Sequence, residues 1–352
     1  MSQASPPPRQ PAPRQPPSPE RILGMSQGYL VTAIVRTALA LGVFERLAQG
    51  PAPAAEVAAS LGTDARATRV LLDALAGLVL VTVDDGAYGL AGSARQALVR
   101  GQPGYLGDVF AAYASDVFWE ALGRLPDAVR HGGSVLEAPA ETEGHEYWEQ
   151  LAGAVTSTIT GPAKAVGDLL APWAAARPTL DVLDVAGGSG IYGFALAARH
   201  PRGRAWILDW PNVLPVARAQ AERLGVLDRA EFVAGDMFDA TLGGPYDLAV
   251  LSQVLHHFSA AKGAQLLERV ASCLRPDGRV VVHDFVAGLA PPAAEPAPHL
   301  FSVLLTAWTR EGEAHTLAAF REMLAAAGFA EPSVHHLPGL PTRALVADRA
   351  AG

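Results

Sequence analysis

After residue 180 the sequence alternates between short apolar runs and longer helical stretches, and this alternation restricts the possible folds more than any other feature. Strands that alternate with helices form a mostly parallel sheet, which helices cover on both faces. Apolar runs that predict strands occur at residues 180–186, 205–208, 230–234, 247–251, 279–284, 333–337 and 343–346. The sequence therefore predicts an α/β fold over residues 178–352, with a Rossmann-like, doubly wound, mostly parallel sheet of seven strands.

The turn after the first predicted strand is rich in glycine: Asp184 is followed by Gly187, Gly188 and Gly190. Glycine lets the backbone come close to a ligand and adopt positive φ angles. In doubly wound sheets, ligands bind beyond the carboxyl ends of the strands. The turn therefore predicts a cofactor site, but glycines alone do not identify the cofactor, because several nucleotide-binding folds use them.

Further acids stand at the ends of the next two predicted strands. Asp209 ends the second strand, where its carboxylate can accept hydrogen bonds from both hydroxyls of a ribose. Asp236 and Met237 follow the third strand, where the acid can accept from an adenine amino group and the thioether can pack on the ring. A helix N-cap is the alternative for each acid. Three acids at successive strand ends, with Asp184 as the first, are hard to attribute to capping alone.

With these motifs the chain resembles the plant-type small-molecule O-methyltransferases and their bacterial relatives, such as the hydroxyneurosporene and anthracycline methyltransferases. The resemblance covers nearly all of the chain after its first residues, and it continues through residues 208–213, 234–238, 274–279 and 327–329. It implies a class I methyltransferase with S-adenosylmethionine as cofactor and a small-molecule acceptor.

The resemblance also implies roles for the cofactor-binding residues. The three glycines of the turn would hold the methionine end of S-adenosylmethionine, Asp209 would hold the ribose, and Asp236 with Met237 would hold the adenine. Ser252 lies where plant members have a lysine that contacts the cofactor. The complete predicted cofactor site consists of Asp184, Gly187, Gly188, Gly190, Asp209, Trp210, Asp236, Met237 and Ser252.

The predicted catalytic residues are His256 and Asp284. His256 aligns with the family's histidine that takes the proton from the acceptor hydroxyl, and histidine suits this role because its ordinary pKa lies near neutral pH. Asp284 matches the first of two supporting acids. The second acid falls on Ala314, with Glu313 one residue early, so the usual arrangement is broken. The alternative for His256 is packing or hydrogen bonding at the pocket edge.

The broken arrangement leaves alternatives to the main prediction, which is methylation of a hydroxyl on a small aromatic or polyketide-like acceptor. One is a C-methyltransferase, with or without a metal, that acts on a 2-oxo acid or an aromatic carbon. Others are an N-methyltransferase and a non-enzymatic regulator that binds the cofactor. Five histidines fall in the acceptor-side half, but no tight spacing such as His-Glu-x-x-His occurs, so no metal is expected.

Residues 21–103 predict a helical and winged-helix module: two helices follow the apolar stretch at 22–47, and a hairpin with an Asp-Gly turn comes after them. Between residues 54 and 100, four basic residues stand against five acidic ones. Since DNA affinity depends on neutralising phosphates, this balance argues against DNA binding. The module is expected to form a homodimer, in which the N-terminal helices of one subunit help to close the pocket of the other.

Residues 104–177 predict a helical linker with an excess of aromatic side chains. Most such side chains pack in a core, but aromatics between two domains also line apolar ligand pockets. The predicted acceptor-pocket residues are Phe110, Tyr113, Trp119, Trp148, His257 and Trp308.

Charge and composition argue against a nucleic-acid-binding, membrane-spanning or secreted protein. The formal net charge is −8 and no long basic run occurs, which argues against nucleic acid and anionic membranes as partners. No apolar stretch approaches the roughly 18 residues of a membrane span. Residues 1–20 are crowded with proline and lack the apolar core of a secretory signal, so they predict a disordered tail. With one cysteine, Cys273, the chain fits a cytoplasmic location.

Overall fold

The computed structural model describes residues 16–337 and 339–350. Most of the predicted disordered tail, up to residue 15, lies outside the described residues, and its last residues belong to the first helix. The chain forms two compact units. We call Ser18–Glu120 with Glu146–Thr160 the N-terminal unit, and Ala121–His145 with Gly161–Gly352 the C-terminal unit.

The N-terminal unit is mostly helical and contains the predicted winged helix. The paired elements are α4 (Ala54–Leu61), α5 (Ala65–Gly77) and the hairpin of β2 (Val81–Asp84) and β3 (Ala87–Leu90). Asp85 and Gly86 form the hairpin turn with φ angles of 45° and 74°, the backbone that short hairpins require. The short strand β1 (Ala52–Pro53) pairs with β3 and completes a three-stranded sheet.

The other helices of this unit have the following bounds: α1 (Pro19–Met25), α2 (Gly28–Leu41), α3 (Val43–Ala48), α6 (Gly92–Leu98) and α7 (Gly107–Tyr113). The core of the unit includes side chains of α3 and α5 that are fully buried: Phe44, Leu47, Leu72 and Leu75. Among the described residues no single helix is long and apolar enough to span a membrane, although the bent pair α1–α2 would pass on length and composition.

The predicted linker, residues 104–177, is helical and is divided between the two units. In addition to α7, this linker contains α8 (Asp116–Gly123), α9 (Leu125–His131) and the long α10 (Glu146–Ala175). The first half of α10 belongs to the N-terminal unit and the second half to the C-terminal unit.

The C-terminal unit contains the predicted sheet of seven strands, in the order β6-β5-β4-β7-β8-β10-β9. Neighbouring strands from β6 to β8 are parallel, and β10 is antiparallel to both β8 and β9. The strands are β4 (Leu180–Val185), β5 (Gly203–Asp209), β6 (Ala230–Ala234), β7 (Tyr246–Ser252), β8 (Leu274–Asp284), β9 (Ser333–His336) and β10 (Arg343–Asp348). The predicted fold class is thereby confirmed.

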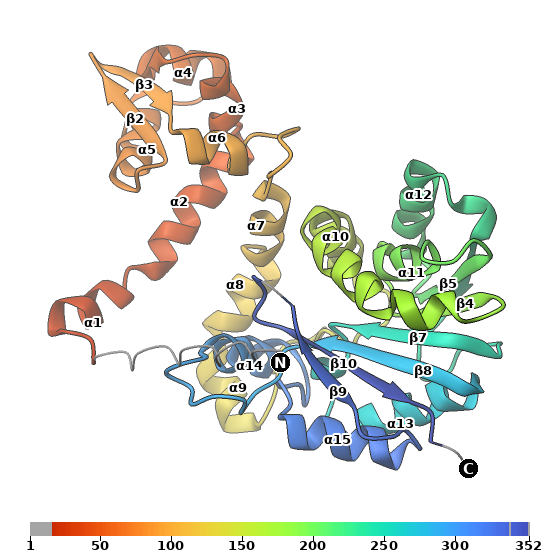
Figure 1. Ribbon diagram of the computed structural model, residues 1–352. Helices are drawn as coiled ribbons and strands as arrows, with labels where there is room; N and C mark the ends of the chain where they lie inside the picture. The colour runs from red at the N-terminus through yellow and green to blue at the C-terminus, as the bar shows by residue number, and fades with distance from the viewer. Residues whose placement is uncertain (1–15, 338, 351–352) are drawn as a thin grey trace, which may run out of the picture. The chain divides into compact units, whose positions relative to one another are not determined.

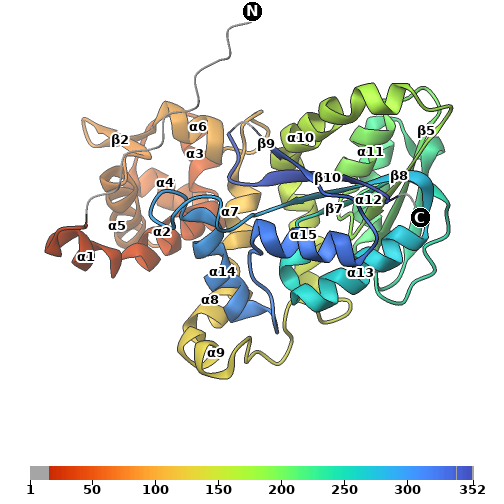
Figure 2. The same ribbon diagram turned by 60° about the horizontal axis from the view of Figure 1, so that its bottom comes forward.

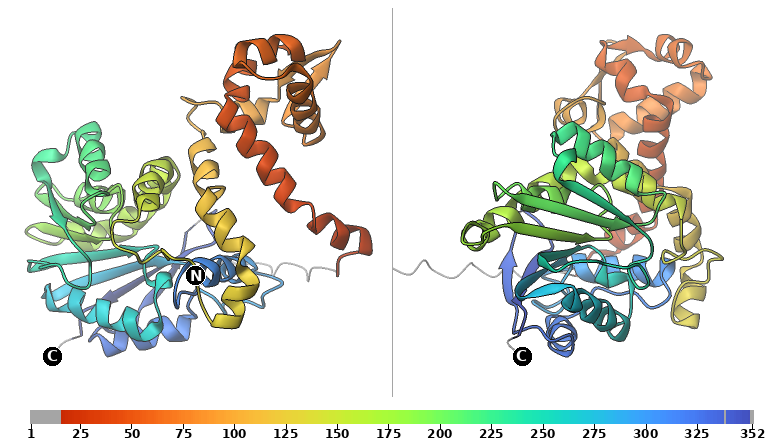
Figure 3. Two further views of the ribbon diagram at one scale, coloured as in Figure 1. Left: turned by 180° about the vertical axis from the view of Figure 1, so that it is seen from behind. Right: turned by 90° about the vertical axis from the view of Figure 1, so that its right-hand side faces the viewer.

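Helices cover both faces of this sheet (Figures 1 and 2): α11 (Ile191–Ala197) and α12 (Leu214–Leu224) lie on one face, α13 (Ala260–Ser272) and α15 (Leu317–Ala326) on the other. Figure 3 shows the same layers from behind and from the side. The chain runs outward from β4 through β5 to β6 and then returns to β7. The strand order therefore reverses between β4 and β7, which is the place where doubly wound sheets bind ligands.

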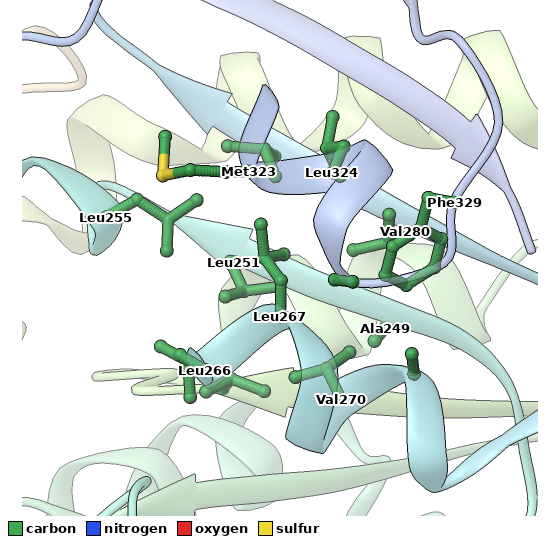
Figure 4. Packing of buried hydrophobic residues seen from close by; sticks show 14 of the residues in the cluster. Ala249, Leu251, Leu255, Leu266, Leu267, Val270, Val280, Met323, Leu324 and Phe329 are labelled. Atoms are coloured by element: carbon green, nitrogen blue, oxygen red, sulfur yellow. The ribbon is translucent and has the colours of Figure 1, made fainter. Parts of the chain in front are cut away.

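A core cluster lies between the sheet and the layer of α13 and α15. Figure 4 shows α13 presenting Leu267 and Val270 to Leu251 and Ala249 of β7. Leu267 and Leu251 are fully buried. Cys273 is 6% exposed in the same cluster, where burial raises the pKa of its thiol to about 11. This packing makes β7 and β8 a rigid support for the residues at their carboxyl ends.

Candidate active site

The glycine turn after β4 is folded so tightly that side chains would not fit. Gly190 has a φ of 72°, and a Cβ there would lie 2.6 Å from the ring of Phe194. A Cβ on Gly187 would lie 2.8 Å from Ile207 of β5. The glycines at 188, 190 and 193 have the Gly-x-Gly-x-x-Gly spacing, which dinucleotide-binding folds also use. The glycine pattern therefore indicates a cofactor turn, and the neighbouring acids must identify the cofactor.

Asp184 supports this turn from within β4. Its Oδ2 accepts a hydrogen bond of 2.8 Å from the N–H of Gly193, the third residue of α11. The side chain is almost fully buried, and burial raises its pKa to about 7. Among the described contacts it thus links the strand end to the start of α11.

Asp209, at the end of β5, has the hydrogen-bonding capacity that a ribose requires. Its Oδ2 accepts from Gly188 N at 2.7 Å, and its Oδ1 accepts from Trp210 N at 2.8 Å. A carboxylate can accept about four hydrogen bonds, so about two acceptor sites stay open for hydroxyl donors. Burial raises the pKa of Asp209 to about 6. Trp210, 8% exposed, follows as part of the loop into α12.

The loop after β6 brings Asp236 and Met237 to the same edge of the sheet. The N–H of Gly235 donates to Asp209 O at 3.1 Å, so the ends of β5 and β6 are tied together. Asp236 Oδ1 accepts from Phe238 N at 2.7 Å. Arg269 of α13 donates to the carbonyls of Met237 at 3.2 Å and Ala240 at 2.7 Å, and thereby holds the loop. The predicted acids thus meet at adjacent strand ends, and their acceptor groups suit the adenosine half of S-adenosylmethionine.

Ser252, at the end of β7, lies across the switch point from these acids. Its hydroxyl lies 3.0 Å from Nδ1 of His283, and the hydroxyl of Tyr192 lies 2.8 Å from the same nitrogen. On the other side of the ring, His283 Nε2 lies 2.8 Å from Thr342 Oγ1. Burial lowers the pKa of His283 to about 4, so this hydrogen-bonded ring is neutral at physiological pH.

His256 and Asp284 form a buried hydrogen-bonded pair. His256 is in the one-turn helix η2 (Leu255–His257) after β7, and Asp284 ends the neighbouring strand β8. His256 Nδ1 donates to Asp284 Oδ1 at 2.6 Å, and the two residues are 2% and 0% exposed. Since Nδ1 carries the proton, Nε2 presents its lone pair, and no described residue hydrogen-bonds to it. A histidine in this tautomer and setting can accept a proton.

Aromatic rings surround His256. Phe301 of α14 (Ala297–Trp308) stands edge-on to the imidazole, with ring centroids 4.8 Å apart. The His257 ring lies 4.4 Å from His256 and 5.9 Å from Trp308. Burial, together with the neighbouring His256, holds the pKa of His257 well below its usual value. Sequence reasoning missed Phe301, although the apolar character of residues 297–308 was a usable signal.

A cavity of about 530 Å³ lies beside His257, the neighbour of His256. His257 and Phe258 form part of its wall, and residues of the 131–141 segment face them. Lys262 and Arg310 contribute the positive charges. His257 therefore lies in a cavity wall, and its role in an acceptor pocket stays a prediction.

The other four predicted pocket residues belong to the N-terminal unit. Tyr113 is 52% exposed and stacks with Phe118 at 6.2 Å between ring centroids. Trp148 stands edge-on to Tyr147, Trp119 donates from Nε1 to Ala114 O at 3.1 Å, and Phe110 is half-buried in α7.

Ala314 stands where the resemblance places the second acid. Ala314 is buried, while the side chain of Glu313 is exposed. Within residues 16–337 and 339–350, no three His, Cys, Asp or Glu side chains are grouped as metal ligands would be.

Comparisons with known proteins agree with this geometry. The family model described as an O-methyltransferase domain matches residues 165–330, and that of the O-methyltransferase dimerisation domain matches residues 23–100. The chain is 30% identical to acetylserotonin O-methyltransferase of Mus musculus, over 94% of this chain and 88% of that protein. It is 26% identical to the tetracenomycin polyketide synthesis 8-O-methyl transferase TcmO of Streptomyces glaucescens, over 93% and 96%. A crystal structure of a Nostoc punctiforme protein assigned to the O-methyltransferases, without an established activity, superposes with a TM-score of 0.85, at 30% identity, over 95% and 100% of the two chains.

Proposed function

This chain belongs to the O-methyltransferase family and uses S-adenosylmethionine, and we propose that it methylates a hydroxyl of a small aromatic or polyketide-like acceptor with His256 as general base. One observation carries the base assignment: the buried His256–Asp284 pair, which leaves Nε2 of the imidazole free to accept a proton. The predicted C- and N-methyltransferase alternatives have no comparable support.

In the proposed reaction, S-adenosylmethionine supplies an electrophilic methyl group on a sulfonium. The acceptor hydroxyl would donate a hydrogen bond to His256 Nε2, and its oxygen would have to face the methyl carbon. As the C–O bond forms and the C–S bond breaks, the hydroxyl proton moves to Nε2. The resulting imidazolium keeps its Nδ1–H on Asp284, whose negative charge stabilises it. S-adenosylhomocysteine leaves as a neutral thioether, and His256 returns the proton to solvent.

Much of the acceleration would come from alignment, because holding two reactants together can contribute about 7–11 kcal/mol. For the methyl donor, we assign the ribose to Asp209 and the adenine to Asp236 and Met237, because their open acceptor sites lie at adjacent strand ends. The glycine turn would hold the methionine end.

The acceptor class follows from the rings around His256 and from the relatives. Phe301 and His257, which are both partly exposed, offer edges and faces on which a flat ring can pack, and the buried Trp308 stands edge-on to His257. The two relatives named above act on acetylserotonin and in polyketide synthesis, and we propose an aromatic or polyketide hydroxyl here.

We further propose that the enzyme is a homodimer formed through the N-terminal unit. The dimerisation-domain match covers residues 23–100. In the single chain, α1 and α2 expose Leu23 at 71%, Met25 at 65% and Tyr29 at 59%. Large exposed apolar patches of this kind mark interaction surfaces. Sedimentation at several concentrations would test this: a chain that stays monomeric at micromolar concentration contradicts it.

The base assignment is tested by His256→Ala, with His335→Ala in the exposed edge strand β9 as control. Purified enzyme, S-adenosylmethionine and a panel of phenols and naphthols are incubated, and S-adenosylhomocysteine release is followed. General bases contribute about 10²–10⁴-fold, so His256→Ala should lose that much turnover while binding S-adenosylmethionine normally by calorimetry. Full turnover in His256→Ala would contradict the assignment of His256 as the base. A product methylated on carbon or nitrogen, identified by NMR, would contradict the assignment of a hydroxyl as the acceptor.

A further inference from the structure

The one-turn helix that carries His256 is held by a side chain far away in the sequence. His315 lies between α14 and α15 and is 2% exposed. Its Nε2 lies 3.2 Å from Leu255 O and 3.0 Å from Phe258 O. Carbonyl oxygens only accept, so Nε2 must carry a proton and donate to both. One imidazole therefore bridges the carbonyls on either side of His256 and His257.

The backbone of His315 is tied to the strand that carries Asp284. The carbonyl of His315 accepts from Ala287 N at 2.9 Å, three residues beyond Asp284. The neighbouring N–H of Ala314 donates to Ser302 Oγ of α14 at 3.0 Å. His315 thus bonds to both segments that carry the His256–Asp284 pair: its ring holds the turn after β7, and its backbone holds the segment after β8.

A second contact restrains the same turn. Gly312 packs so closely on it that a Cβ would lie 2.5 Å from His256 O. Its N–H donates to Thr309 Oγ1 at 2.8 Å, and this hydroxyl donates to Leu305 O at 2.8 Å. At the start of the turn, Leu255 points into the core beside Met323 (Figure 4). The residues 309–315 therefore form a fixed wall behind His256.

We propose that His315 is a positioning residue for the methyl transfer: it sets the place of His256 relative to Asp284 and touches neither substrate. This rests on the proposed base role of His256. The chain has Ala314 in the position of a second supporting acid, so the imidazole has one carboxylate partner. Its alignment then depends on the backbone of its turn, which His315 holds.

The test compares three variants of the full chain. His315→Leu removes the donor. His315→Gln keeps an amide N–H₂ that can donate to both carbonyls. His200→Leu is the matched control, because His200 is also a buried histidine (8% exposed) whose Nε2 donates to a carbonyl, Arg177 O at 3.1 Å, away from the turn. Turnover and KM are measured separately, S-adenosylmethionine binding by calorimetry, and the His256 Nδ1–H by NMR.

We expect His315→Leu to lower kcat about 10–100-fold, the scale of a misplacement near 1 Å, with unchanged S-adenosylmethionine affinity. The NMR signal of the His256 Nδ1–H bonded to Asp284 should shift or broaden, and His315→Gln should restore both rate and signal. His200→Leu should lower the melting temperature and leave kcat and the signal unchanged. If His315→Leu does not fold, His315→Met replaces it, since the flexible thioether fills the space without a donor.

A purely structural role would give the opposite result: His315→Leu would lose stability like His200→Leu and keep kcat and the His256 signal. The proposal is then overturned. Should His256→Ala keep its turnover, the base assignment fails, but the NMR signal in His315→Leu still decides whether His315 positions the turn.

Discussion

Replacing Asp284 with asparagine separates the charge of this carboxylate from its hydrogen bonds. In the structure Oδ1 accepts from both His256 Nδ1 at 2.6 Å and Phe285 N at 2.8 Å, whereas Oδ2 is buried without a hydrogen-bond partner among the described residues. An asparagine can place its oxygen at the Oδ1 position and its amide nitrogen at the Oδ2 position. The variant should therefore keep the orientation and tautomer of His256 and lose only the negative charge.

The size of the loss follows from the kind of hydrogen bond. A bond to a charged group contributes about 1.5–3 kcal/mol, and a neutral one about 0.5–1.5 kcal/mol. The charged bond is therefore stronger by about 1–2 kcal/mol, and this difference is lost in the transition state, where the imidazolium forms. About 1.36 kcal/mol in the activation free energy corresponds to a tenfold change in rate. Asp284→Asn should lower kcat about 5–30-fold. Asp284→Ala also removes the acceptor that fixes the His256 tautomer, so its loss should approach that of His256→Ala, about 10²–10⁴-fold.

The assay is single-turnover formation of S-adenosylhomocysteine at saturating methyl donor, so that product release does not enter. Asp277→Asn is the control, because this acid is bonded to Arg177 with a side chain that is 73% exposed. An Asp284→Asn rate equal to that of the parent would refute the stabilising role of the charge. A rate as low as that of Asp284→Ala would show that the asparagine turns its amide toward Nδ1 and selects the wrong tautomer.

Three further predictions concern the turn, its supporting acid and the core. Burial raises the folded-state pKa of Asp184 from 3.8 to about 7, so the parent loses stability as pH rises from about 4 to 7. The free energy of unfolding that Asp184→Asn gains over the ligand-free parent should therefore grow over this window, by at most about 4 kcal/mol, and level off above it. A difference in melting temperature between the two proteins that does not change with pH would contradict this. Gly190→Ala should weaken S-adenosylmethionine binding in calorimetry, because the alanine would need a φ of 72° and meet the Phe194 ring, and an unchanged affinity would show that the turn has room. Leu267→Ala, at a fully buried position, should lower the free energy of unfolding in urea by about 2–5 kcal/mol, whereas a loss below 1 kcal/mol would mean that the core refills the cavity.

The fold could be predicted closely because it depends on local patterns. Parallel strands that are buried on both faces appear in the sequence as short continuous apolar runs. The helices between them are longer and have a helical spacing of apolar residues, which distinguishes them from strands. Each of the seven predicted strands is present, and the Asp-Gly turn marks the hairpin of the winged helix. The positions of Asp184, Asp209 and Asp236 at strand ends follow from the same patterns.

The site could be predicted only in part. His256 and Asp284 were identified by resemblance, but their contact depends on the register of β7 and β8, in which Ser252 lies opposite His283. Ser252 was predicted to contact the cofactor, and this stays a prediction; its described partner is His283. Arg269, which holds the loop of Met237, belongs to a helix whose sequence shows only an amphipathic pattern.

By itself, then, the sequence determined the order of strands and helices, the glycine turn and the chemical types of the residues at the strand ends, because these depend on neighbours along the chain. Tertiary structure alone decided that His315 bonds to carbonyls 60 and 57 residues away and that Gly312 packs on the turn of His256. Backbone carbonyls are the same in every residue, so no sequence pattern reveals which donor reaches them; only the packing of α14, α15 and the ends of β7 and β8 brings these groups together.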